Sequence, residues 1–206
     1  SRQQRFTQAL EERHLDAFLV THLPNVRYLC GFTGSSGVLV VSDGRAFFFT
    51  DGRYREQAHQ EVQGASIRVA KGPVIAGAAT RLKKARARRV GLESEHVTLA
   101  QKSALAALLP SRVRLRPLTG LAGRLRAVKD AEEVQRLRAA VGLASSLYPA
   151  LLKQIRPGVK ESEVAGGLEF AARRAGASGM AFDTIVASGV RSALPASLHP
   201  APAVRL

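Results

Sequence analysis

A two-residue turn between two apolar runs constrains the fold of this chain more than any other feature. Residues 38–41 and 45–50 are rich in Val and Phe, and Ser42-Asp43-Gly44 joins them. Asp-Gly in this position favours a β-hairpin, because the tightest hairpin turns need positive φ angles that these two residues tolerate. An antiparallel pair of strands is therefore expected around Gly44.

Short apolar runs and helical spacings alternate on both sides of this hairpin. The sequence predicts helices at residues 6–13, 55–62, 74–86 and 99–109, and strands at residues 15–20, 67–69, 89–92 and 113–115. A hairpin combined with alternating strands and helices favours a mixed sheet that has helices on both faces. The chain is accordingly placed in the α/β class.

A basic connector with two glycines divides the chain. Residues 118–129 carry Gly120 and Gly123 among arginines and a lysine, which is typical of a domain boundary. We expect one domain at residues 1–120, a linker at residues 121–129 and a second domain at residues 130–206.

The second domain is expected to open with two helices. Asp130 and Glu133 have the spacing of a capping box, and apolar residues follow at alternating steps of three and four. Pro149 is expected to kink this long helix. Lys160 precedes the next helix, at residues 161–175. Its side chain cannot accept hydrogen bonds from backbone N–H groups, so the helix lacks about 1 kcal/mol of stability that a capping residue would provide. The apolar positions of the long helix are Val134, Leu137, Val141, Ala144, Tyr148, Leu151 and Ile155.

The stretch GASGMAFDTIVASGVRSALP, at residues 176–195, follows these helices and predicts a glycine turn, a strand at residues 182–188 and a loop. It resembles the opening of the catalytic "pita-bread" domain, an α+β fold, of the Xaa-Pro peptidases, the family of aminopeptidase P, prolidase and creatinase. The positions that agree with the family pattern are Phe182, Ile185, Val186, Ala187, Ser188, Gly189, Ser192, Ala193 and Pro195.

The first half carries the same resemblance. The phrases HLPNVRYLCGFTGSSG and FTDGRYREQA are similar to the creatinase-type N-terminal domain, which has a ribonuclease-H-like fold. The resemblance implies a domain that makes dimer contacts and closes over a cleft for proline-containing peptides. On this basis Arg53, Tyr54 and Phe182 are expected to bind substrate. The alternative is that Arg53 and Tyr54 only form the capped start of a helix.

The agreement ends at Pro195. Ala196 occupies the position of the family's histidine, and the family's metal ligands lie further on: two aspartates, a histidine and two glutamates that hold two divalent ions, Mn, Co or Zn. Residues 186–206 contain no Asp or Glu. Because a two-metal peptidase needs several carboxylates around one cavity, we expect no catalytic residue, no metal ligand and no cofactor in this chain, and no activity. We also expect that the reading frame changes after Pro195, which translation of the other two frames tests.

Other catalytic and binding patterns are excluded. No histidine pair has the helical spacing of a zinc peptidase, Cys30 has no partner for nucleophilic catalysis, and the Gly-x-Ser-x-Gly elbow does not occur. The glycine-serine loop at residues 31–37 lacks the lysine and the following helix of a phosphate-binding loop. The histidines are His14, His22, His59, His96 and His199, and isolated surface positions are expected for them.

Composition limits the partners and the compartment. The net charge of +15 favours an anionic partner, but the arginines are spread over most elements and there is no Trp for base stacking, so nucleic acid is not expected. A single cysteine, no apolar run of membrane length and no signal peptide favour a cytoplasmic protein without a membrane anchor.

Three functions compete at this stage. The first is a shortened, inactive relative of an Xaa-Pro metallopeptidase, the second is a non-catalytic dimerisation or binding module of that family, and the third is an anion-binding protein. An incomplete pita-bread domain leaves apolar surface open, so we expect a homo-oligomer whose contact includes residues after Lys129.

Overall fold

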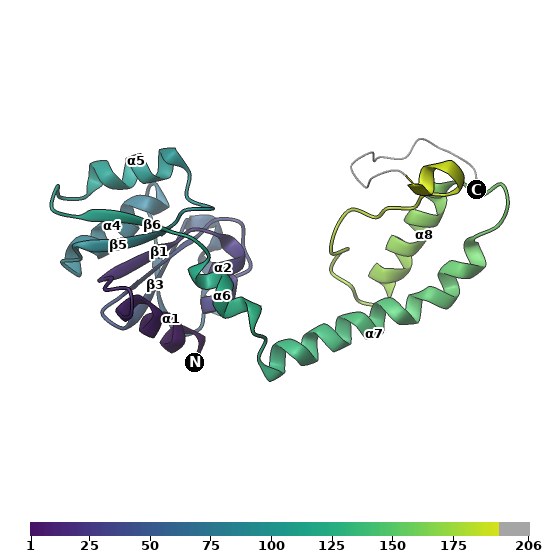
Figure 1. Ribbon diagram of the computed structural model, residues 1–206, viewed down its shortest axis with the longest axis horizontal. Helices are drawn as coiled ribbons and strands as arrows, with labels where there is room; N and C mark the ends of the chain where they lie inside the picture. Colours follow the sequence, from purple (N-terminus) through teal and green to yellow (C-terminus); the bar gives the residue numbers. More distant parts are fainter. Residues whose placement is uncertain (194–206) are drawn as a thin grey trace. The chain divides into compact units, whose positions relative to one another are not determined.

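The computed structural model describes residues 1–193. The chain divides into two compact units, one at Ser1–Val128 and one that begins at Lys129. The first unit is an α/β domain and the described part of the second is helical (Figure 1). Both agree with the predicted class, so the fold expected from the sequence is confirmed.

A six-stranded mixed sheet forms the centre of the first unit. Its order is β4-β3-β2-β1-β5-β6. Strand β2 is antiparallel to both β1 and β3, whereas the pairs β3–β4, β1–β5 and β5–β6 are parallel. The strands are β1 (Ala17–Val20), β2 (Val38–Ser42), β3 (Arg45–Thr50), β4 (Ala65–Val69), β5 (Arg89–Glu93) and β6 (Arg114–Leu118).

The predicted hairpin is present. Ser42 pairs with Arg45, which leaves a two-residue turn in which Asp43 has a φ of 51° and Gly44 a φ of 66°. Positive φ at both central residues is the geometry whose twist matches that of the flanking strands. Local turn chemistry therefore fixes the pairing of β2 with β3.

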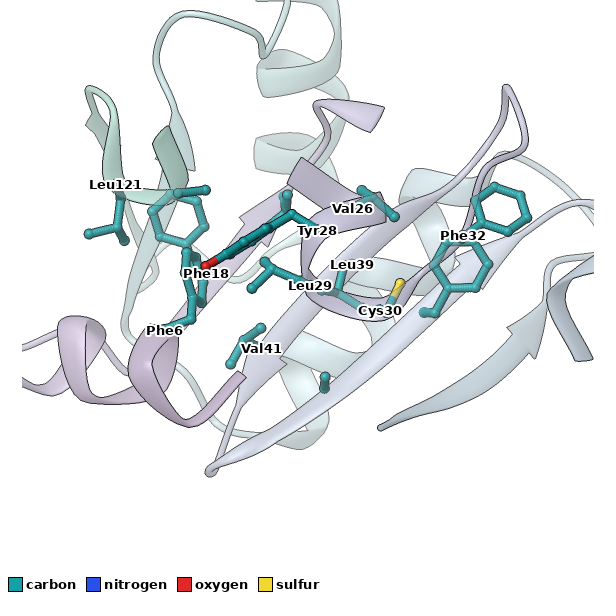
Figure 2. Packing of buried hydrophobic residues seen from close by; sticks show 14 of the residues in the cluster. Phe6, Phe18, Val26, Tyr28, Leu29, Cys30, Phe32, Leu39, Val41 and Leu121 are labelled. Carbon is teal, nitrogen blue, oxygen red and sulfur yellow. The ribbon is translucent and has the colours of Figure 1, made fainter. Parts of the chain in front are cut away.

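Helices cover both faces of the sheet, and each face has its own core. One core joins the sheet to α1 (Arg2–Glu11), α2 (Leu23–Cys30), α3 (Arg55–Glu61) and α6 (Leu121–Ala127), and the other joins it to α4 (Val74–Lys84) and α5 (Leu99–Leu108). Figure 2 shows the first core, where the rings of Phe6 and Phe18 meet edge to face with centroids 5.4 Å apart.

Three details of the first unit differ from the sequence expectation. Helix α2 was not predicted; it begins with Pro24 in its first turn and ends at Gly31, whose φ of 87° only glycine adopts without strain. Strand β6 does not stop before Pro117 but includes it, because an edge strand can lose one N–H donor. Segment 121–129, expected as a linker, contains α6, which buries Leu121.

The second unit opens with the two expected helices, α7 (Ala131–Gln154) and α8 (Glu161–Arg174). The capping box of Asp130 and Glu133 is formed, and α7 continues through Pro149. Lys160 stands at the N-cap of α8 and its side chain makes no cap hydrogen bond, as predicted.

The strand predicted at residues 182–188 is wrong. This segment is irregular and is followed by a short 3₁₀ helix, η2 (Gly189–Ala193). A strand exists only where a neighbouring strand completes its hydrogen-bond ladder, and the part of this unit that the structure describes contains no strand. The apolar alternation of the sequence is therefore present without the partner that would make it a strand.

Candidate functional site

The first candidate site lies where the loop after α2 meets the turn after β3. The turn is the 3₁₀ helix η1 (Gly52–Tyr54), and Asp51 caps it by accepting a hydrogen bond from the backbone N–H of Arg53. The hydroxyl of Thr50 donates to the carbonyl of Ser36 at 2.6 Å and so ties strand β3 to the loop. We call residues 33–37 together with residues 51–54 the loop site.

Arg53 is bound to Asp51 through two contacts. Its Nε and one terminal nitrogen each lie 3.0 Å from a different carboxylate oxygen, which is the bidentate geometry that an arginine offers. Hydrogen bonds from Arg53 and then from Ser36 hold the pKa of Asp51 far below its usual range. The Arg53 side chain is 74% exposed, so the guanidinium is held in place and is also open to solvent.

Tyr54 is held by its hydroxyl and by two contacts of its ring. Its hydroxyl lies 2.5 Å from the Ser35 hydroxyl, and its ring meets Phe32 edge to face at 5.6 Å. A Cβ at Gly34 would lie 2.7 Å from the Tyr54 ring, so the loop approaches the ring closely only because residue 34 is glycine. One hydrogen bond and two close ring contacts therefore hold the tyrosine in position.

A carboxylate from α3 anchors the beginning of the loop. Glu61 accepts hydrogen bonds from the Thr33 backbone N–H and from the Thr33 hydroxyl, both at 2.7 Å, and Gln57 donates to the same pair. Burial raises the pKa of Glu61, but the hydrogen bonds from Thr33 outweigh it and the pKa is lowered. Glu61 was not predicted from the sequence, because its partner Thr33 is 28 residues away along the chain.

The second candidate site lies in the second unit and is built around Glu161. This carboxylate is 1% exposed, and one of its oxygens accepts from the Ser188 backbone N–H at 2.7 Å and from the Ser188 hydroxyl at 3.1 Å. Its other oxygen lies 3.3 Å from Nε of Arg191. Burial raises the pKa of Glu161, while the hydrogen bonds from Ser188 and the charge of Arg191 lower it by more.

These contacts attach the segment that contains Ser188 and Arg191 to the start of α8. We call Glu161, Ser188 and Arg191 the loop anchor. It replaces the predicted strand as the element that positions the chain just before Pro195. Ser188 belongs to the motif recognised in the sequence, but Glu161 and Arg191 were not predicted, since a glutamate at a helix start usually interacts only with its own helix.

The predicted substrate-binding residues are distributed over both units. Arg53 and Tyr54 belong to the loop site, while Phe182 is in the second unit and 77% exposed. Ala196, at the position of the family's histidine, lies outside the described residues. Arg53 and Tyr54 also form the start of the helical segment, as the alternative interpretation expects, and their role in substrate binding stays a prediction.

The described histidine and cysteine side chains bear on metal and nucleophile chemistry. The sequence predicted isolated histidines. This prediction is wrong for His22 and His96, which are stacked with ring centroids 3.6 Å apart. Burial and the neighbouring His96 lower the pKa of His22. Burial raises the pKa of the Cys30 thiol to about 11, which keeps it protonated and unreactive.

Within residues 1–193, no group of three or more His, Cys, Asp or Glu side chains has the arrangement of a metal site. The described residues therefore do not fit a pair of catalytic metal ions. None of the helices in this part of the chain is both long and apolar enough to cross a membrane.

Comparison with known proteins identifies the family. Residues 2–128 match the creatinase/prolidase N-terminal domain, and residues 135–205 match metallopeptidase family M24. The chain belongs to the creatinase/prolidase family of peptidases. A relative in Bacillus subtilis, the uncharacterized peptidase YqhT, is 38% identical over 181 residues.

Solved structures support this assignment for both units of the chain. The Xaa-Pro dipeptidase from Bacillus anthracis superposes with a TM-score of 0.89 at 37% identity and covers 95% of this chain. The N-terminal domain of the cytoplasmic peptidase PepQ from Mycobacterium tuberculosis, a structure of that domain alone, matches 61% of this chain at 34% identity with a TM-score of 0.57.

The match covers only part of each full-length relative. This chain spans 51% of the B. subtilis peptidase and 54% of the B. anthracis dipeptidase chain, whereas it spans 98% of the isolated M. tuberculosis domain. The first unit thus corresponds to a domain that has been obtained as a separate structure. The match to the M24 peptidase domain is limited to residues 135–205.

Proposed function

We propose that this chain provides the peptide-recognition and assembly part of an Xaa-Pro metallopeptidase and does not hydrolyse peptide bonds by itself. The observation that carries the proposal is the absence of a three-ligand group of His, Cys, Asp or Glu within residues 1–193, in a chain that covers about half of the relatives it matches. Two-metal hydrolysis needs several carboxylates that converge on one cavity. The buried Glu161 carboxylate does not supply one, because Ser188 and Arg191 already occupy it.

The ligand of the recognition part is proposed to be a peptide that contains proline. The guanidinium of Arg53 is exposed and carries the charge needed to bind a peptide carboxylate, and its contact with Asp51 keeps the guanidinium plane in a fixed orientation. The Tyr54 ring, held by Ser35 and Phe32, and the exposed Phe182 ring provide apolar surfaces for a pyrrolidine ring. Each of these residues acts within its own unit in this proposal.

Activity and metal content test the proposal together. The purified chain is incubated with Mn²⁺, Co²⁺ or Zn²⁺, its metal content is measured after gel filtration, and hydrolysis of Xaa-Pro dipeptides is followed. We expect no turnover and no bound metal pair, while the B. anthracis dipeptidase serves as the active control. Turnover by the chain, or two tightly bound ions per chain, contradicts the proposal.

Peptide recognition has its own assay. Binding of a labelled Xaa-Pro dipeptide is compared between the chain, an Arg53→Ala variant and an Arg55→Ala variant. Arg55 begins α3, lies two residues from Arg53 and makes none of the contacts described above, so it is a matched control. We expect the Arg53 variant to lose at least about tenfold in affinity, as loss of a charged hydrogen bond implies, and the Arg55 variant to lose little.

The alternative function is a non-catalytic dimerisation module of the same family. It is favoured by apolar side chains that α7 exposes, among them Leu137, Val141 and Tyr148. In this alternative, copies of the chain associate into a homo-oligomer through such side chains. The compartment proposed for the chain is the cytoplasm, in line with the name of the M. tuberculosis relative. Nucleic acid is not a partner in either version.

A further inference from the structure

A cavity lies at one end of the sheet in the first unit. Its volume is about 440 Å³, within the range of about 300–1,000 Å³ that small-molecule sites usually have. The end of α1, the β2–β3 hairpin and the turn between α4 and β5 line it. We call it the hairpin cavity, and among its lining residues are Glu11, Asp16, Ser42, Asp43, Arg86 and Arg88.

The hairpin cavity is separate from the loop site. The loop site lies where β2 begins and β3 ends, whereas the cavity lies at the opposite ends of these two strands, around their turn. The two share no residue. A ligand of the cavity therefore makes contacts that the proposed function does not use.

Two of the carboxylates that line the cavity are already bound. Asp16 accepts hydrogen bonds from the backbone N–H groups of Arg88 and Arg89 and pairs with the Arg89 guanidinium at 3.2 Å. Asp43 pairs with Arg81 at 2.7 Å. These contacts hold the three lining segments together, so both aspartates serve as walls of the cavity.

Three other charged side chains of the cavity have no ion pair and no hydrogen bond within residues 1–193. They are Arg86, Arg88 and Glu11, and all three are exposed. A guanidinium group offers a fork of N–H donors that matches a carboxylate. The carboxylate of Glu11 suits an ammonium group in the same way. The available charges thus call for a ligand that carries both signs.

Arg86 stands at a position that glycine fits better. It follows the C-cap of α4, Ala85, and has a φ of 53°. Helices often end with glycine in this left-handed conformation, because a Cβ there comes too close to a backbone carbonyl. The arginine backbone gives the helix end no advantage. Strained positions of this kind cluster at functional sites, which directs attention to the Arg86 side chain.

Two buried polar atoms by the hairpin have no hydrogen-bond partner in the part of the chain that the structure describes. One is Oγ of Ser42, a residue that lines the cavity and is 2% exposed. The other is Nε of Arg81, the arginine that holds Asp43. Buried polar atoms nearly always have a partner. A hydroxyl and an N–H group that are both left over favour a polar ligand at this end of the sheet.

We propose that the hairpin cavity binds a small zwitterion, a free α-amino acid or a short peptide. Its carboxylate meets Arg86 and Arg88, and its ammonium group meets Glu11. An anion without a positive group, such as phosphate, faces the carboxylates of the cavity as well as its arginines and is bound less well. The inference goes beyond the proposed function and does not rest on it.

The first experiment varies the ligand. Binding to the intact chain is measured by calorimetry with L-valine, N-acetyl-L-valine, L-valinamide and inorganic phosphate. We expect saturable binding of L-valine and at least about tenfold weaker binding of the acetylated and amidated forms, because each lacks one of the two charges. Phosphate or N-acetyl-L-valine that binds as tightly as L-valine contradicts the proposal, as does the absence of saturable L-valine binding up to about 10 mM.

The second experiment varies the cavity. Arg86→Gly removes the guanidinium and supplies the residue that the φ angle favours, so we expect an equal or higher melting temperature together with at least about tenfold weaker L-valine binding. Glu11→Gln is expected to weaken binding by a similar factor. Lys83→Gln and Glu12→Gln are matched controls, since both residues lie close in sequence but do not line the cavity, and they are expected to bind like the unchanged chain.

The variants also separate this site from the loop site. If Arg86→Gly and Glu11→Gln both bind L-valine as the unchanged chain does, the ligand lies elsewhere and the proposal is wrong. If Arg53→Ala abolishes L-valine binding, the loop site holds the ligand instead. Binding that depends on Arg86 and Glu11 but not on Arg53 supports the hairpin cavity, whatever the outcome for Xaa-Pro dipeptides.

Discussion

The two units of this chain differ in how their apolar residues are used. In the first unit a six-stranded sheet has a core on each face, and its large side chains Phe6, Phe18, Phe32 and Phe48 are nearly or fully buried. In the part of the second unit that the structure describes, only Glu161, Val164 and Ala172 are buried. Burial of one large apolar side chain contributes about 1.5–3 kcal/mol, so the core contributes far more to the stability of the first unit than the few buried side chains in the described part of the second unit contribute there. Substitutions in the two units test this difference.

The largest effect is expected in the first core. Phe18 is fully buried, contacts Phe6 edge to face and lies so close to Gly91 that a Cβ there would be 2.3 Å from its ring. Phe18→Ala is therefore expected to lower the free energy of unfolding of the first unit by about 3–5 kcal/mol, measured by urea denaturation. Phe182→Ala, at an exposed phenylalanine of the second unit, is the control and is expected to change stability by less than about 0.5 kcal/mol. Equal losses in the two variants contradict the comparison.

A smaller effect is expected from overpacking in the loop site. A Cβ at Gly34 would lie 2.4 Å from the Phe32 ring and 2.7 Å from the Tyr54 ring, so Gly34→Ala pushes two aromatic side chains apart. The expected cost is about 1–3 kcal/mol, together with faster hydrogen exchange in the loop. Gly72→Ala is the matched control, because no atom lies within 4 Å of the Cβ it adds. A Gly34 variant as stable as the Gly72 variant shows that Tyr54 is not held by the close approach of the loop.

The two units also differ in how well their structure could be predicted from the sequence. The Asp43-Gly44 hairpin was predicted correctly because its φ angles depend on two adjacent residues. The strand at residues 182–188 was not, because a strand requires a partner strand and not only an alternating pattern. Glu61 and Glu161 were missed because they bind residues 28 and 27 positions away, a distance that only the folded chain closes. Periodicity thus predicts elements, while the polar contacts that hold loops depend on the tertiary structure.

The loop anchor is expected to respond to pH. The folded pKa of Glu161 is lowered from its ordinary value of 4.5 by the hydrogen bonds from Ser188 and the charge of Arg191. The anchoring contribution is therefore fully present above pH 4.5 and is lost as the pH falls through the lower folded pKa. The amide signal of Ser188, followed by NMR from pH 7 to pH 3, is expected to shift with this lowered pKa.

Removing the charge tests the same anchor at neutral pH. Glu161→Gln is expected to abolish the pH-dependent shift of the Ser188 amide and to release the segment around Arg191, which becomes more sensitive to trypsin. Glu163→Gln, an exposed glutamate of the same helix, is the control and is expected to leave both unchanged. If the Ser188 amide titrates as before in the Glu161 variant, another group anchors the loop.

The smallest effect is expected at the start of α8, where the two helices of the second unit differ. Helix α7 has a complete capping box from Asp130 and Glu133, whereas the N-cap of α8 is Lys160, which has the extended φ and ψ of a cap residue (−79° and 143°) but no acceptor. Lys160→Ser supplies the missing oxygen, and Glu163 already stands at the third helical position, so the substitution completes a second box. The expected gain is about 1 kcal/mol in the stability of the second unit. Lys160→Ala removes the same lysine without adding an acceptor, so any difference in melting temperature between the two variants measures the cap alone. A helix pair that depends on its caps gains measurably from the serine, and equal melting temperatures mean that contacts other than the caps hold the second unit together.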